Sequence, residues 1–365
     1  PTTFPFMKRL VTSAALAFAF SFVTPVAHAN PAAASLIQKE YQTAMEKWSL
    51  ELRLANTPDT RAAAIAKRPD SPAYAERMWA LIRPSLKEEW TIEPAAWFLG
   101  LTSTIAANPN FTAHTAELLK AIDTWHVNSP KLTPICFALT GAADPSSLAL
   151  LEKIEKTNPD KKIQGVAALA AAMILKSSGE TPELMARRLN YIRKAIIESA
   201  DVEINGTPVS KIADDELYII RYLTKGRLAP DLNGVNSGGT PMSLSQYQGK
   251  IVVLVFWNSG TQDSARLVDF ANMLDDKYRD RNVVVLGVNN DPTAKLRDFQ
   301  ADGSVKFQNF SDPENKLSAE YRIGTWPLSY VLDSGRKVAF AGAPGSFTEF
   351  AVEALLLPQA KPAGR

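Results

Sequence analysis

The stretch Ile251-Val-Val-Leu-Val-Phe-Trp-Asn-Ser-Gly-Thr-Gln-Asp-Ser264 decides the fold of this chain of 365 residues. Its first part, residues 251–256, is a run of apolar, mostly β-branched side chains, which is typical of a strand buried on both faces. After Ser264 the apolar residues recur at helical spacing, at Leu267, Ala271, Leu274 and Tyr278. The stretch therefore predicts a buried strand, a loop and the start of a helix.

Strands and helices alternate from this junction to the end of the chain. Strands are predicted at 283–288, 328–333 and 337–340, with a short extended piece at 305–307, and helices after Pro292, over 313–321 and from Ser346 onward. A βαβ unit followed by a helix, a hairpin and a terminal helix predicts an α/β sandwich with a mixed sheet.

Six short pieces of this region occur in the order that is found in one known family. They are Ala229-Pro-Asp231, Ser243-Leu-Ser-Gln-Tyr-Gln-Gly-Lys250, Phe256-Trp257, Gly287-Val-Asn-Asn-Asp291, Gly324-Thr-Trp-Pro327 and Tyr330-Val-Leu-Asp-Ser-Gly335. Residues 226–358 therefore resemble a TlpA/ResA-like thioredoxin-fold domain of the wider redoxin (AhpC/TSA-like) group. No single piece is specific, and the resemblance rests on their order.

The resemblance implies a disulfide-exchange site that faces a cis-proline. Pro327 matches the cis-proline, Thr261 the nucleophilic cysteine and Ser264 the resolving cysteine. In such proteins the helix N-terminus stabilises a cysteine thiolate. Disulfide exchange needs a thiolate that attacks sulfur, and peroxide reduction passes through a cysteine sulfenate, so a hydroxyl supports neither reaction. We therefore expect a thioredoxin-like domain in which the redox positions have lost their catalytic residues.

The loops around these positions remain a candidate binding surface. The residues expected to form it are Gly260, Thr261, Thr325, Trp326 and Pro327. A cis-proline would expose the backbone of Thr325 and Trp326 for pairing with an extended peptide, and the Trp326 ring offers a flat apolar contact. The alternative is that Trp257 and Trp326 only fill the interior of a site that has lost its function.

Residues 30–225 show helical periodicity almost throughout, which predicts an all-α domain, either an irregular bundle or an α-solenoid. The Ala-rich run 162–176 predicts a central, buried helix. At 201–209 the helical rhythm breaks, and the tight-turn signal Asn205-Gly206 predicts a small hairpin or an extended crossing. A turn-rich passage then begins the thioredoxin-like domain, 226–365. The helical half looks like the N-terminal part of some secreted bacterial redoxin-domain proteins.

No group of side chains has the spacing of a metal site, and no cofactor is implied. Asp214-Asp215-Glu216 lie near the start of the last helix predicted in the helical half, where the helix dipole explains carboxylates. His114 and His126 have no second pair of ligands nearby. Backbone N–H groups at the helix that starts at Ser264 could bind an anion, although Asp263 would compete with it.

The first residues of the sequence predict export. Met7–Ala29 has the basic start, the short apolar run and the small-x-small end of a secretory signal peptide. Cleavage after Ala29 would leave a periplasmic or secreted protein without a membrane span, and retention as an anchor is the alternative. Removal of Lys8 and Arg9 from the 40 basic residues leaves 38, which equals the 38 acidic residues, so no nucleic acid partner is implied.

Cys136 is the only cysteine, so the chain has no internal disulfide. Its apolar neighbours predict a buried core residue, and a reactive thiol or an intermolecular disulfide is the alternative. The sequence therefore predicts a redox-inactive binding or scaffold protein of the cell envelope, with an extended peptide or an envelope protein as its partner. Two alternatives remain: a thiol-disulfide oxidoreductase or antioxidant redoxin that uses Cys136, and a protein whose helical half is the functional part.

Overall fold

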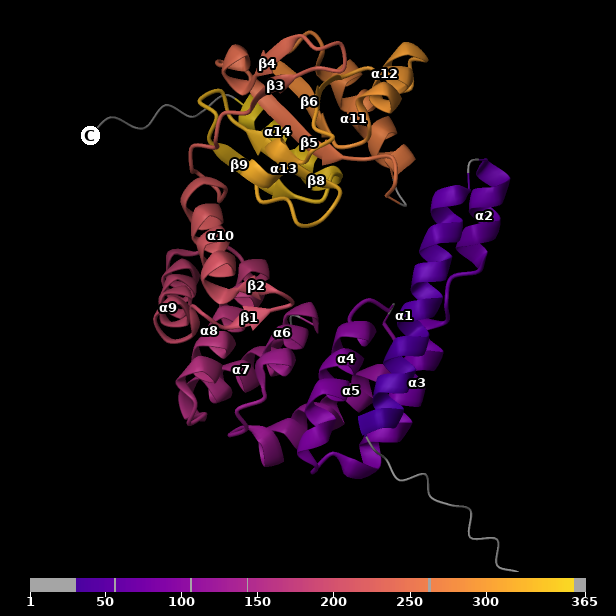
Figure 1. The fold of residues 1–365 in the computed structure, drawn as a ribbon. Coiled ribbons are helices and arrows are strands. Elements are labelled where there is room, and N and C mark those ends of the chain that lie inside the picture. Colours follow the sequence, from indigo (N-terminus) through magenta and orange to yellow (C-terminus); the bar gives the residue numbers. More distant parts are fainter. Residues whose placement is uncertain (1–30, 56, 106, 143, 262–263, 358–365) are drawn as a thin grey trace, which may run out of the picture. The chain divides into compact units, whose positions relative to one another are not determined.

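A computed structural model describes residues 31–55, 57–105, 107–142, 144–261 and 264–357 (Figure 1). The predicted signal peptide, Met7–Ala29, lies outside these residues. The chain divides into two compact units, one that ends at Thr91 and one that begins at Ile92. The boundary predicted between residues 225 and 226 lies inside the second unit and stays a prediction.

The first unit is helical. Its α-helices are α1 (Pro31–Leu54), α2 (Pro58–Ala66) and α3 (Ser71–Ile82). A proline in the first turn and a side-chain cap begin α2 and α3, where Thr57 and Asp70 accept hydrogen bonds from backbone N–H groups. Helix α1 packs on α3, and the rings of Tyr41 and Tyr74 meet edge to face at 5.1 Å.

The second unit begins with further helices. They are α4 (Ile92–Thr102), α5 (Pro109–Ala121), α6 (Thr133–Ala142), α7 (Pro145–Thr157), α8 (Lys161–Leu175), α9 (Pro182–Ser199) and α10 (Val209–Tyr222). Helix α8 packs against α6, α7 and α9 and is buried on almost every side. The prediction of a central Ala-rich helix is thereby confirmed, because small side chains let neighbouring helices surround it.

A two-stranded hairpin precedes α10. Strands β1 (Glu203–Ile204) and β2 (Thr207–Pro208) pair around Asn205 and Gly206, whose φ angles are 49° and 78°. Both residue types tolerate this left-handed conformation, so the predicted tight turn is confirmed. The dipole role expected for the acids of α10 is wrong, because Asp214, Asp215 and Glu216 lie beyond its first turn. Asp215 and Glu216 instead form ion pairs, which are described below.

The rest of the unit is a sheet covered on both faces. Its elements are the hairpin β3 (Asn233–Val235) and β4 (Pro241–Ser243), the sheet strands β5 (Ile251–Trp257), β6 (Val283–Asn289), β7 (Gln308–Ser311), β8 (Leu328–Leu332) and β9 (Val338–Gly342), and the helices α11 (Ser264–Tyr278), α12 (Thr293–Ala301), α13 (Lys316–Glu320) and α14 (Ser346–Leu356).

The strand order is β7-β6-β5-β8-β9, with β5, β6 and β7 parallel and with β8 and β9 antiparallel to their neighbours. The expected thioredoxin-like sandwich with a mixed sheet is therefore confirmed (Figure 1). The short extended piece predicted at 305–307 lies directly before β7, which begins at Gln308, and its Val305 and Phe307 side chains are buried in the core.

Strand β5 is buried on both faces, as its sequence predicts. Its even-numbered residues, such as Leu254, face a core shared with α13, the β3–β4 hairpin and Leu223 just after α10. Its odd-numbered residues, such as Val253, face a second core shared with α11, α12 and α14. This alternation follows from the two-residue period of a strand. Within the described ranges, no helix is both long enough and apolar enough to cross a bilayer.

Candidate functional site

Two loops meet at one edge of the sheet. Strand β5 ends at Trp257 and strand β8 begins at Leu328, which pairs with Phe256 in antiparallel register. The residues that follow Trp257 and those that precede Leu328 therefore lie at the same edge. The structure thus brings Gly260, Thr261 and Ser264 from one loop to the edge where Thr325, Trp326 and Pro327 arrive from the other.

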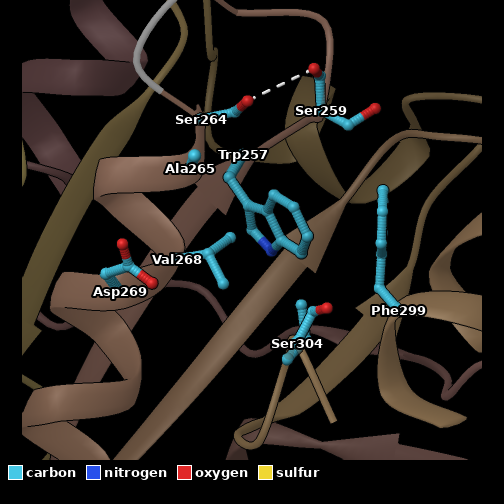
Figure 2. Close-up of a pocket in the computed structure, with 9 residues that line it drawn as sticks. Trp257, Ser259, Ser264, Ala265, Val268, Asp269, Phe299 and Ser304 are labelled. Carbon is cyan, nitrogen blue, oxygen red and sulfur yellow. Dashed lines mark hydrogen bonds between the residues drawn. The ribbon is translucent and has the colours of Figure 1, made fainter. Parts of the chain in front are cut away.

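Thr261 and Ser264, which the resemblance places at the redox positions, carry hydroxyls that donate to backbone carbonyls. Thr261 Oγ1 donates to the carbonyl oxygen of Asn258 at 3.2 Å, and Ser264 Oγ donates to that of Ser259 at 3.2 Å. The backbone N–H of Ser264 donates to the Thr261 carbonyl at 3.2 Å, which closes the turn into α11. Figure 2 shows the Ser264–Ser259 bond. These side chains hold the turn, and within the described part of the chain the acceptor of each hydroxyl is a backbone carbonyl.

The buried carboxylate of Asp291 anchors the loop that follows β5. Asp291, which is 9% exposed, accepts from the backbone N–H of Ser259 at 2.8 Å and from Ser259 Oγ at 2.7 Å. Asn289 Nδ2 donates to the same carboxylate at 2.9 Å. Sequence reasoning used Asp291 as part of a family-like piece and as the start of a helix, and it missed this role. An acid placed directly after the neighbouring parallel strand was the available signal, because the ends of parallel strands meet at one edge.

Trp257 belongs to the core. Its ring is buried between Phe299 and Phe307, with centroid distances of 6.4 Å and 6.2 Å, and its Nε1 donates to Asn309 Oδ1 at 2.8 Å. Gly287 makes room for this bond, since a Cβ there would lie 2.8 Å from Trp257 Nε1 and would overlap the Asn309 side chain. For Trp257, the structure therefore supports the alternative in which its ring fills the interior of the domain.

The second loop carries the cis-proline that the resemblance implies, because the Trp326–Pro327 peptide bond is cis. Gly324 and Thr325 are exposed, whereas Trp326 is half-buried. The Trp326 ring meets Phe256 edge to face, with centroids 6.5 Å apart and planes at 71°. Gly324 and Thr325 are therefore the accessible residues of this loop, while the tryptophan is partly committed to the core.

The predicted binding residues do not share one cavity. Ser264 lines a pocket of about 430 Å³ together with Trp257, Val268 and Phe299 (Figure 2). Thr325 lines a larger groove of about 900 Å³ on the side of α10. Gly260, Thr261, Trp326 and Pro327 line neither of these two cavities. Of the five residues predicted to form one binding surface, Thr325 lines the larger groove, and the shared surface itself stays a prediction.

Cys136 is placed away from both loops. It lies on α6, is 0% exposed, and burial raises the pKa of its thiol to about 12. A buried thiol with this pKa is neither a nucleophile nor a metal ligand at neutral pH. Among the described residues, no three His, Cys, Asp or Glu side chains are grouped as ligands for a metal ion. Gln262 and Asp263 lie outside the described residues, so the expected competition between Asp263 and an anion stays a prediction.

The part of the chain that carries this site is similar to known redox proteins. Residues 225–341 match the AhpC/TSA family. The thiol-disulfide oxidoreductase ResA of Bacillus anthracis is 26% identical over 114 residues, which are 31% of this chain and 66% of that protein. ResA of Geobacillus kaustophilus (strain HTA426) is 27% identical over the same shares of both chains. The chain thus spans just under two thirds of the length of these relatives.

Solved structures with a similar fold cover the same region. The thioredoxin domain of thiol-disulfide oxidoreductase BVU-2223 from Bacteroides vulgatus is 20% identical, with a TM-score of 0.33, and the match covers 36% of this chain and 96% of that one. A thiol:disulfide interchange protein of the thioredoxin family from Chlorobium tepidum TLS is 19% identical, with a TM-score of 0.33 and shares of 36% and 98%.

Proposed function

Starting from an AhpC/TSA-family redoxin domain at residues 225–341, we propose that this chain is a redox-inactive protein of the cell envelope that binds an extended polypeptide. Its role would be that of a binding or scaffold module. The observation that carries the proposal is the pair of hydroxyls, Thr261 and Ser264, that stand at the redox positions and donate to backbone carbonyls.

The chemistry of the site supports the loss of redox activity. Thiol exchange needs a thiolate at the start of α11, and the thiol at Cys136 is buried with a pKa of about 12. At pH 7 such a thiol is ionised in only about 1 molecule in 100,000. An oxidoreductase that uses Cys136 would therefore need a second conformation in which α6 opens.

The second loop supports polypeptide binding. Gly324 and Thr325 present exposed backbone directly before β8, at the edge where Thr261 also lies. An extended peptide can pair with such backbone groups, and pockets beside it then select side chains. Trp326, half-buried against Phe256, would give an apolar contact that is already held in place.

The cellular location is part of the proposal. The sequence Met7–Ala29 has the features of a secretory signal peptide and supports export to the periplasm or beyond. An exported redoxin domain without redox sulfurs would meet unfolded or extended segments of envelope proteins, and it would hold them without oxidising or reducing them.

Binding of a permanently unfolded, sulfur-blocked polypeptide tests the proposal. Carboxymethylated α-lactalbumin, labelled with a fluorophore, should bind the full chain, and Thr325→Pro should weaken binding because it removes a backbone N–H donor. Thr325→Val keeps that N–H and serves as the matched control. If Thr325→Pro fails to fold, protection of the Gly324 and Thr325 amides from hydrogen exchange by the ligand replaces it. Equal binding by both variants, or no protection at these amides, would contradict the proposal.

A further inference from the structure

The larger groove beside Thr325 has an unbalanced set of charges. It lies in the second unit and runs from the loop before Pro327 along α10 to the C-terminal end of α8, with a volume of about 900 Å³. Its walls combine charged side chains with apolar ones, among them Met173, Ile212, Ile219, Ile323 and Leu328. Its size is that of a typical ligand site.

Four cations converge on two carboxylates in this groove. Asp215 is paired with Lys211 at 2.6 Å and with Arg322 at 2.7 Å. Glu216 is paired with Lys176 at 2.9 Å and with Arg188 at 3.0 Å. The groove thus holds more positive charge than these two acids neutralise.

A third carboxylate at the groove, Glu180, does not remove the excess. It is exposed and accepts a hydrogen bond from the backbone N–H of Lys225 at 2.8 Å. Even when Glu180 is counted, the four cations outnumber the lining carboxylates. A ligand with a negative charge would therefore find complementary charge here.

Arg188 gives an independent indication of the same chemistry. Its side chain is 1% exposed, yet its Nε has no hydrogen-bond partner among the described residues. Its Nη2 bonds Glu216, whereas its Nη1 has the weak acceptor Met185 Sδ at 3.7 Å. A buried guanidinium normally has its donors satisfied, because an unmet donor loses its hydration without replacement. The groove thus keeps a cation that its own residues neutralise incompletely.

The second loop continues into this groove. Arg322 lies over the ring of Tyr218 at 4.0 Å and pairs with Asp215, so the segment before Pro327 is held against α10. Gly324 and Thr325 line the groove at this end. A peptide paired with their backbone would place its next side chains among Ile323, Leu328 and Lys211, the lining cation that α10 supplies.

We propose that the groove binds an acidic side chain, Asp or Glu, of an extended polypeptide, with apolar side chains beside it. The inference rests on the proposed polypeptide-binding function and names the ligand chemistry of that site. The ligand carboxylate would accept hydrogen bonds from the ammonium groups of the exposed Lys211 and Lys176 at the groove's rim. The buried Arg188 would add to the positive electrostatic potential of the groove without touching the ligand.

Selection from a phage library of random dodecapeptides on the purified full chain gives the first readout. Enriched peptides should carry Asp or Glu next to apolar residues. The best peptide and its version with Glu or Asp replaced by the amide are then compared by fluorescence anisotropy. The amide version should bind about tenfold more weakly, since a hydrogen bond to a charged group is lost. Raising the salt concentration should reduce the difference.

Lysine variants locate the contact. Lys211→Met should lower the affinity for the acidic peptide about threefold and leave the affinity for the amide peptide unchanged. Lys162→Met is the matched control, because Lys162 is similarly exposed, 55% against 59%, is paired with one carboxylate, Asp201, and does not line the groove. Lys176→Met gives a second, independent variant of the rim.

The outcomes separate the inference from the proposed function. Enriched peptides without acidic residues, equal affinity of the acidic and amide versions, or acidic binding that neither Lys211→Met nor Lys176→Met weakens would overturn the inference and leave polypeptide binding intact. A library from which no peptide is enriched would overturn both.

Discussion

Thr261 and Ser264 stand at the two ends of a turn whose geometry depends on backbone hydrogen bonds. The turn closes through the Ser264 N–H and the Thr261 carbonyl, and Ser259 ties it to Asp291. None of these bonds needs sulfur. At the scale of single residues, the turn is therefore held without a thiol, and this makes a direct prediction possible.

Placing cysteines at both positions should create a reactive thiol. In a Cys136→Ala background, the double substitution Thr261→Cys and Ser264→Cys places a thiol at the start of α11, where the helix dipole favours the thiolate. The pH dependence of iodoacetamide alkylation of the reduced variant should then show a thiol pKa between about 3.5 and 7.5.

The single substitution Ser264→Cys in the same background is the control for position within the turn. A pKa near that of free cysteine, about 8.5, at the restored Thr261 position would contradict the idea that the turn still has a thiolate-stabilising geometry.

At the scale of elements, the ends of β5 and β6 share one packed junction. Trp257 at the end of β5 reaches across to Asn309 on β7, and Gly287 on β6 lies beneath that bond. This junction holds the end of β5, from which the candidate site starts.

Gly287→Ala should lower the free energy of unfolding by about 1–3 kcal/mol, because the new methyl group overlaps the Asn309 side chain. Gly100→Ala is a suitable control, since a Cβ at this helical position has nothing within 4 Å and alanine favours helix. Urea unfolding of both variants tests the prediction. Equal free energies of unfolding for Gly287→Ala and the wild type would contradict it, because the side chains of Asn309 and Trp257 would then have moved aside at no cost in stability.

Most of these elements follow from local patterns, and the missing details come from tertiary contacts. The apolar runs of β5 and β6 predict both strands, and Asn205-Gly206 predicts the hairpin before α10. The start of β7 at Gln308 is one such detail, because the Val305 N–H donates to the carbonyl of Phe299 and not to a neighbouring strand. The Ser259–Asp291 contact depends on the parallel pairing of β5 and β6, which joins residues distant in sequence.

The surroundings of the candidate site also depend on tertiary contacts that local patterns do not predict. The motif predicts that Gly260, Thr261, Thr325, Trp326 and Pro327 meet at one edge of the sheet. It does not contain the groove, whose other wall comes from α8, α9 and α10. Periodicity identifies these as helices, but it cannot tell which of their faces lie beside the loop that holds Arg322.

At the scale of the whole molecule, ion pairs join helices of the second unit to one another, and an apolar contact joins the end of α10 to the sheet. Glu216 on α10 binds Arg188 on α9 and Lys176 after α8, while Leu223, just after α10, enters the core of the sheet. A change at Glu216 should therefore affect the stability of the unit as well as the groove.

Glu216→Gln should lower the free energy of unfolding by about 3–5 kcal/mol, because it leaves the buried Arg188 guanidinium without its counter-charge. Asp214→Asn, on the neighbouring exposed position, should change stability by less than about 0.5 kcal/mol. Urea unfolding followed by circular dichroism measures both. A similar, small effect of the two substitutions would show that Arg188 finds other partners.

The central claim is that this redoxin domain does no redox chemistry, and turnover by the purified full chain tests it most directly. Reduction of insulin disulfides and reduction of hydrogen peroxide are measured with excess dithiothreitol, with the Thr261→Cys and Ser264→Cys double variant as the positive control. We predict that the wild-type chain and Cys136→Ala show the rate of the buffer blank in both assays. Turnover by the wild-type chain above that blank would contradict the claim, and its loss in Cys136→Ala would identify Cys136 as the thiol responsible.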